Sequence, residues 1–242
     1  MLGEMWRSLL GYLEKQPYWS RLQPILLFLF LALPAFAQPQ RSEVIKALFK
    51  NDGEGFFDPA KNEALKKVLA TNPKLDIYET AALGTSEALE KMLRDDPEAL
   101  KRPNAFGWTL LHLAAFGGNV PNTELLLRKG AEVNVRAKTK FRNTPLQTAL
   151  LSGQYATSKL LLEHGADVLV RQALGFTPMH EAAVLGRVDL VNLLLEHGAE
   201  LNSRSDSGRT PLSDAIRRKH DELAAMLRAK GAKTEETADV EP

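Results

Sequence analysis

Gly175-Phe-Thr-Pro-Met-His-Glu-Ala-Ala183 decides the fold of this chain, because its core phrase returns at a fixed interval. The phrase opens on a threonine, and four such threonines stand 35, 33 and 33 residues apart: Thr109, Thr144, Thr177 and Thr210. A second phrase, Gly-Ala, keeps the same step at Gly130, Gly165, Gly198 and Gly231. A period of this length indicates an array of stacked structural repeats.

The order of residues within one repeat predicts two helices joined by a tight turn. Thr followed by Pro suits a helix start, because the hydroxyl accepts from free backbone N–H groups and Pro tolerates the first helical position. Small residues such as Ala182-Ala183 let a second helix approach closely, and the pair Gly186-Arg187 breaks the chain before that helix. The Gly after the second helix can take the left-handed conformation that closes a helix. We therefore expect helix, turn, helix and an extended loop in each repeat.

These residues closely resemble the ankyrin repeat family over about two-thirds of the chain, and 175–202 is nearly an ideal family repeat. A degenerate copy lies upstream, where Asp76 stands 33 residues before Thr109 in place of the threonine. The resemblance implies an all-α fold, a solenoid of stacked helix-turn-helix units with β-turn loops. We expect about five repeats over 75–233, the first and last degenerate, which exceeds the roughly three that a continuous core needs.

Residues 1–37 have the order of a secretory signal peptide. Three basic residues precede a wholly apolar run at 25–33, and Pro34-Ala-Phe-Ala37 offers small residues where an A-x-A cleavage site needs them. We expect cleavage after Ala37 and an exported protein, periplasmic or secreted. An uncleaved signal anchor is the alternative, and only that form would associate with the membrane.

The two segments that flank the repeats are less regular. Residues 38–74 predict a helical cap region, because Val44, Ile45, Leu48 and Phe49 share a helical spacing and Asp58-Pro59 begins a second helix. The acidic stretch 234–242 predicts a short disordered tail.

Composition excludes several classes of protein. The chain has no cysteine, which removes disulfides and thiolate metal sites. Without the three basic and two acidic residues of the signal peptide, 28 basic and 28 acidic residues are left. A balanced chain lacks the basic excess that nucleic-acid binding usually needs. We expect a monomer that binds no nucleic acid, metal or cofactor.

The five histidines have scaffold explanations in place of catalytic ones. The resemblance implies that His112 and His180, at the fourth place of the repeat phrase, tie adjacent loops by hydrogen bonds. His164, His197 and His220 also stand at places common in the family. The chain has no nucleophile elbow and no Gly-rich phosphate loop. We therefore expect a non-enzymatic protein.

Aromatic, apolar and arginine residues recur at fixed phases of the loops and first helices. The resemblance implies a concave surface there, on which family proteins commonly bind partners. Equivalent residues of successive repeats lie side by side, so we expect one aromatic strip edged by guanidinium groups, of the types enriched in interface hot spots. The predicted protein-binding residues are Phe106, Trp108, Phe116, Arg136, Phe141, Leu151, Arg171, Leu174, Phe176, Leu185, Arg204 and Arg209.

The sequence predicts an exported scaffold that docks a partner protein on this strip. Three alternatives stay open: the aromatic rings pack on neighbouring loops, the strip carries a small apolar ligand or cofactor, or the chain is a membrane-tethered structural envelope component. Docking predicts that replacing Trp108 and Phe176 by Ala weakens partner capture and leaves thermal stability nearly unchanged. An equal loss of folding would favour packing.

Overall fold

The computed structural model describes residues 75–104 and 107–234, together with Lys67 and Ala70. The predicted signal peptide over 1–37, all of the predicted acidic tail except Thr234, and nearly all of the predicted cap region 38–74 lie outside these residues. The residues from Leu75 onward belong to one unit. Its regular elements, within the described residues, are ten α-helices and one 3-10 helix, which confirms the predicted all-α fold.

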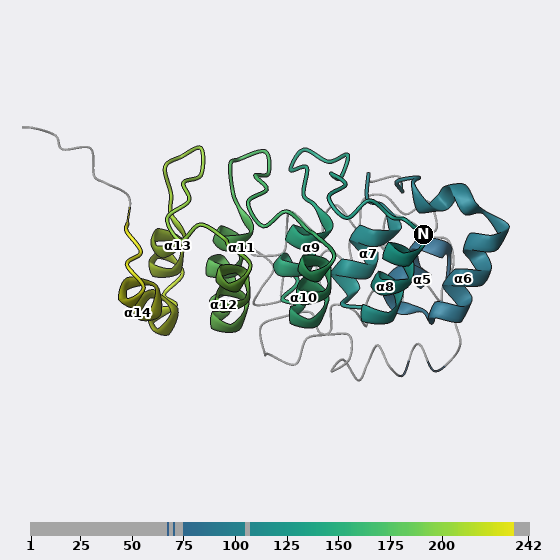
Figure 1. Ribbon diagram of the computed structural model, residues 1–242, viewed down its shortest axis with the longest axis horizontal. Helices are drawn as coiled ribbons and strands as arrows, with labels where there is room; N and C mark the ends of the chain where they lie inside the picture. The colour runs from purple at the N-terminus through teal and green to yellow at the C-terminus, as the bar shows by residue number, and fades with distance from the viewer. Residues whose placement is uncertain (1–66, 68–69, 71–74, 105–106, 235–242) are drawn as a thin grey trace, which may run out of the picture. The chain divides into compact units, whose positions relative to one another are not determined.

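The ten α-helices form five consecutive pairs that stand side by side, with the loops between pairs gathered along one edge (Figure 1). A 3-10 helix, η2 (Pro97–Leu100), follows the first pair. The pairs are α5 (Ile77–Leu83) with α6 (Ser86–Asp95), α7 (Leu110–Gly117) with α8 (Val120–Arg128), α9 (Pro145–Leu151) with α10 (Tyr155–Glu163), α11 (Pro178–Leu185) with α12 (Val188–Glu196), and α13 (Pro211–Arg217) with α14 (Asp221–Ala229).

The first helix of each pair begins where the repeat phrase predicts it. Thr144 precedes α9, its Oγ1 accepts from the backbone N–H of Gln147 at 3.4 Å, and the Gln147 side chain accepts from the N–H of Thr144 at 3.2 Å. In the degenerate first repeat Asp76 takes the place of threonine, and its Oδ1 accepts from the N–H groups of Tyr78 and Glu79 at 2.9 and 2.8 Å. Both arrangements satisfy backbone donors that a helix start leaves open.

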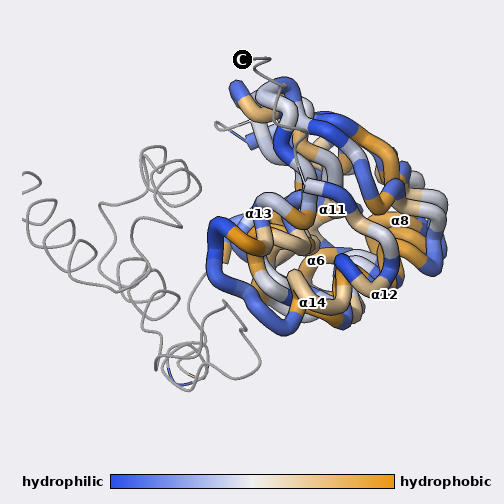
Figure 2. Tube along the Cα trace, turned by 90° about the vertical axis from the view of Figure 1, so that its left-hand side faces the viewer, coloured by the Kyte–Doolittle hydropathy of each residue, from blue (hydrophilic) through white to orange (hydrophobic). Residues whose placement is uncertain are grey.

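The core of the stack lies between the first and second helices. The first helices α5, α7, α9, α11 and α13 pack on one another in series, and each also packs on its own second helix. Leucines dominate the interior, and those fully buried include Leu110, Leu126, Leu146, Leu161, Leu190 and Leu194. Hydrophilic residues gather instead at the turn between α13 and α14, at the C-terminal end of the row (Figure 2). None of the described helices has the length and apolarity that crossing a membrane requires.

Candidate functional site

Four loops precede the first helices of the second to fifth pairs, and together they are called the loop edge: loop 1 (101–108), loop 2 (134–143), loop 3 (169–176) and loop 4 (202–209). Backbone hydrogen bonds of 2.8 to 3.1 Å join each loop tip to the next. They run from Lys138 to Gly107, from Ala173 to Phe141 and from Asp206 to Leu174. The tips are therefore held in a fixed row, and side chains on them keep fixed spacings.

The fourth place of the repeat phrase ties each first helix to the following loop. His112 is fully buried, and its Nε2 lies 3.0 Å from the carbonyl oxygen of Asn143 in loop 2. The backbone N–H of Thr109 points at Nδ1, 3.3 Å away, so Nδ1 accepts and Nε2 carries the proton. Burial lowers the pKa of His112 to about 4, so the ring is neutral. His180 repeats the arrangement toward the carbonyl of Arg209 at 2.9 Å, and burial also lowers its pKa.

A second column of side chains binds each pair to the pair before it, and sequence reasoning missed this role. The residue before each second helix donates to a carbonyl near the end of the preceding first helix. Asn119 donates to Gly84 at 2.9 Å, Gln154 to Phe116 at 3.5 Å, Arg187 to Gly153 at 3.1 Å, and His220 Nε2 lies 3.0 Å from the oxygen of Val184. The sequence held a sign of this role, because the residue before the second helix carries a side-chain donor in every repeat.

Two arginines of the predicted strip also bridge neighbouring loops. The Nη1 of Arg136 donates to the carbonyl oxygen of Arg171 at 2.8 Å, and the Nη1 of Arg171 donates to that of Arg204 at 2.8 Å. Arg171 also pairs with Asp206 at 3.0 Å. Arg136, Arg171 and Arg204 are all exposed, but Arg136 and Arg171 also hold neighbouring loops of the loop edge together.

The expectation of exposed rings is wrong for Trp108 and Phe116, which are each 8% exposed. Their ring centroids lie 5.9 Å apart in an edge-on arrangement, because the tryptophan at the end of loop 1 folds down onto the last turn of α7. Trp108 and Phe116, two members of the predicted strip, therefore pack beneath the surface and support it. Phe106 lies outside the described residues.

The remaining strip residues keep exposed or half-buried surface. Leu174, at the tip of loop 3, is 54% exposed. Phe176 is half-buried, with the guanidinium carbon of Arg209 4.7 Å from its ring centroid. The other half-buried apolar members are Phe141, Leu151 and Leu185. Leu169, 47% exposed at the start of loop 3, is a further apolar residue that the predicted strip omitted.

Two buried carboxyl groups lie on the first helices of the last two repeats. Glu181 in α11 accepts from the side chain of Gln172 at 3.2 Å, and burial raises its pKa well above the usual value. Asp214 in α13 pairs with Arg209 and with Arg217. Within the described part of the chain, no three histidine, aspartate or glutamate side chains gather closely enough to hold a metal ion.

The repeat geometry agrees with a comparison against protein families. The family model described as ankyrin repeats (3 copies) matches residues 77–172 and 168–238, a repeat domain that is typically non-catalytic. Comparison with curated proteins gives no match. Because the family model covers more than half of the sequence, and because the helix pairs and loops follow its period, the chain belongs to the ankyrin repeat family.

Proposed function

We propose that this protein is an exported, non-enzymatic scaffold that docks a partner protein on its loop edge and on the adjoining first helices. Ankyrin repeats generally mediate binding between proteins, which supports the general role. The site and the export are the specific parts of the proposal.

The main support for this binding site is the position of Leu174. This large apolar side chain is 54% exposed at a loop tip, although loops 2 and 4 hold its backbone on both sides. Exposed leucines are ordinary when single, but Phe141 stands on the neighbouring tip, and one hydrogen bond joins Ala173 to it at 3.0 Å. Two apolar residues fixed side by side favour an interaction site.

The scaffold beneath these residues makes docking a rigid-body event. Buried His112 and His180 fix the loop bases, and Trp108 and Phe116 support the surface near loop 1. A preformed surface loses little conformational entropy when a partner binds. The proposed surface therefore comprises Phe141, Leu174, Leu151, Phe176 and Leu185, and the arginines at its edge.

Site-specific photocrosslinking in the native host tests this proposal. A benzophenone amino acid at Leu174 should form an adduct of one defined mass, and the same group at Glu196, exposed near the end of α12, should form none. Equal adducts at both positions, or none at Leu174, would contradict docking at the loop edge. Substituting Phe141→Ala should reduce the Leu174 adduct without unfolding the chain.

Export has an independent test. The pattern of residues 1–37 supports a mature chain that begins at Gln38. Mass spectrometry of the intact protein from the native host should give that N-terminus. An intact leader would favour a membrane-tethered form instead.

A further inference from the structure

Loop 2 differs from the other loops in length and in charge. It has two more residues than the period allows, and Arg136, Lys138, Lys140 and Arg142 place four cations in the seven residues 136–142. No carboxylate stands in that segment. The equivalent seven-residue stretches of loops 3 and 4, 169–175 and 202–208, hold one cation each. Since the mature chain has balanced charge overall, this concentration is local.

Arg142 adds an observation from the backbone. It has a φ of 57°, in the left-handed region, where loops 1, 3 and 4 carry Gly107, Gly175 and Gly208 with φ of 82°, 73° and 81°. A residue with a Cβ is disfavoured in this conformation, and such strain concentrates at functional sites. Glycine satisfies the fold at this position in the other loops, and Arg142 adds a fourth cation to the cluster instead.

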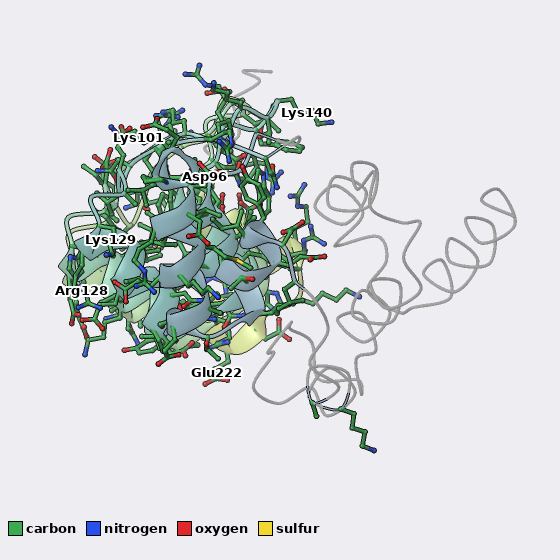
Figure 3. All side chains as sticks on the ribbon, turned by 90° about the vertical axis from the view of Figure 1, so that its right-hand side faces the viewer. Asp96, Lys101, Arg128, Lys129, Lys140 and Glu222 are labelled. Atoms are coloured by element: carbon green, nitrogen blue, oxygen red, sulfur yellow. The ribbon has the colours of Figure 1, made fainter. Side chains whose placement is uncertain are left out.

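Arg136 bonds to loop 3, and hydrogen bonds hold the backbone that carries the other three cations of loop 2. Lys138, Lys140 and Arg142 are exposed, and Lys140 stands out from the loop edge (Figure 3). Within the described residues no carboxylate lies at ion-pair distance from Lys138 or Arg142; the described ion pairs near the loop edge are those of Arg102 with Asp96, Arg171 with Asp206, and Arg209 with Asp214. The N–H groups of Ala137 and Lys138 donate to Asn143 and Gly107 at 2.8 Å, and that of Arg142 to the Thr139 hydroxyl at 3.1 Å.

Apolar side chains lie among these charges. Phe141 is half-buried, and the ammonium group of Lys140 lies 4.9 Å from its ring centroid. Leu174 follows on the next tip, 54% exposed. A ligand that fits this surface needs negative charge together with at least one large apolar group. The chain as a whole has a net charge of only +1 and lacks the basic excess that nucleic-acid binding usually needs.

We propose that loop 2 recognises an acidic segment of a partner protein, whose carboxylates pair with Lys138 and Arg142 and whose apolar side chain packs on Phe141 and Leu174. This inference rests on the proposed function, since it names the chemical class of the partner. Charge complementarity sets the choice of partner, and the ordered loop limits the entropy lost on binding.

A random peptide library displayed on phage, selected against the full chain, provides the probe. Selected peptides should combine several Asp or Glu with a Leu, Ile or Phe, and their affinity should fall with salt. Arg142→Gly should weaken the selected peptides about tenfold, as expected for a lost charge-assisted contact. Peptides without acidic bias, or no enriched peptide at all, would overturn the proposal.

Lys219→Gly is the matched control. Lys219 also has a left-handed φ, of 60°, but it lies in the turn between α13 and α14, where other repeats carry Gly118, Gly153 and Gly186. Both variants lose one positive charge and relieve the same backbone conformation, so they should change the melting temperature alike. Only Arg142→Gly should weaken peptide binding. An equal loss in both variants would mean a nonspecific charge effect and would overturn the proposal.

Two outcomes separate this inference from the proposed function. If the Leu174 crosslink forms and Arg142→Gly leaves it unchanged, the acidic partner is wrong and docking at the loop edge stands. If vesicles with 30% phosphatidylserine bind loop 2 in an Arg142-dependent way while no acidic peptide is selected, the loop faces an anionic membrane, and the peptide proposal fails.

Discussion

The Nε2 of His112 donates to the carbonyl oxygen of Asn143, 3.0 Å away and thirty-one residues further along the chain. The bond links the first helix of one repeat to the loop that opens the next. It requires a neutral ring, because Nδ1 must accept from Thr109 while Nε2 donates. Protonation at Nδ1 would place a donor against the backbone N–H of Thr109 and a charge in a buried site.

Stability should therefore fall in acid through the histidines. Burial lowers the pKa of His112 to about 4 in the folded chain, from an ordinary value of 6.5. Between these values the unfolded chain binds more protons, so the free energy of unfolding falls as the pH drops through this window, by up to about 1.4 kcal/mol per pH unit. Below pH 4 the ring is protonated in both states and this slope disappears. Urea unfolding from pH 7 to pH 4.5 measures the effect.

His112→Gln isolates this contribution, because Gln147 already performs the same two bonds in the next repeat. The Gln147 side chain accepts from the backbone N–H of Thr144 at 3.2 Å and donates to the carbonyl of Phe176 at 3.3 Å. The stability curve of His112→Gln should be flatter than that of the wild type between pH 6.5 and 4. His164→Gln, at an exposed histidine, is the control and should keep the wild-type slope. Parallel curves for His112→Gln and wild type would contradict the neutral buried ring.

Glu181 should act in the opposite direction. Burial raises the pKa of its carboxyl in the folded chain, so above pH 4.5 the folded chain holds a proton that the unfolded chain releases. This group therefore lowers stability as the pH rises. Glu181→Gln removes the titration, keeps the shape, and should be more stable than wild type at pH 8 by a margin that shrinks toward pH 5. Guanidinium unfolding at both pH values, with exposed Glu196→Gln as control, tests this; a constant margin would mean that Glu181 does not titrate in this range.

The repeat fold could be predicted from the sequence because one period governs both the pattern and the packing. The threonine phrase and the closing glycines specify helix starts and ends locally, as Thr144 and Gly165 show. The exposure of individual rings could not be predicted in this way. Whether Trp108 points outward depends on Phe116, one helix length away, and on side-chain rotamers that sequence spacing does not determine.

Recurrence itself separates scaffold from function in this chain. Arg136 and Arg171 recur at one phase, and the structure shows both bound to the next loop, just as the recurring His112 and His180 are. A residue that must tie each repeat to the next is expected in every repeat. Arg142, in contrast, departs from the glycine of the other loops. Recurrence therefore marks scaffold residues, and a departure from the period indicates a site where a second feature, such as the cation cluster around Arg142, stands beside it.

Trp108 and Leu174 should separate stability from binding. Trp108→Ala removes a large buried side chain and should lower the free energy of unfolding by about 3–5 kcal/mol. Leu174→Ala removes an exposed side chain and should change it by less than about 0.5 kcal/mol. Thermal and chemical unfolding give both values. If Trp108→Ala were as stable as the wild type, the Trp108 ring would not contribute to packing and would again be a candidate for the binding surface.

Asn122 should decide whether the degenerate first repeat stays attached to the stack. Its side chain is fully buried, and its Nδ2 donates to the carbonyls of Thr80, Ala81 and Gly84 at 2.8 to 3.1 Å. Asn122→Ala leaves these acceptors with one donor fewer, and such losses amount to about 1–3 kcal/mol. Repeats contact only their neighbours, so the damage should stay local.

Hydrogen exchange measures where that damage falls. In Asn122→Ala, amides of α5 and α6 should exchange faster, while those of α11 to α14 keep their wild-type protection, because three repeat interfaces separate α13 and α14 from the lost contact. Asn192→Ala is the control, since Asn192 lies half-buried in α12 and the described residues offer its side chain no hydrogen bond. It should leave α5 and α6 unchanged. Uniformly faster exchange along the whole stack in Asn122→Ala would mean that the five repeats unfold as a single cooperative unit.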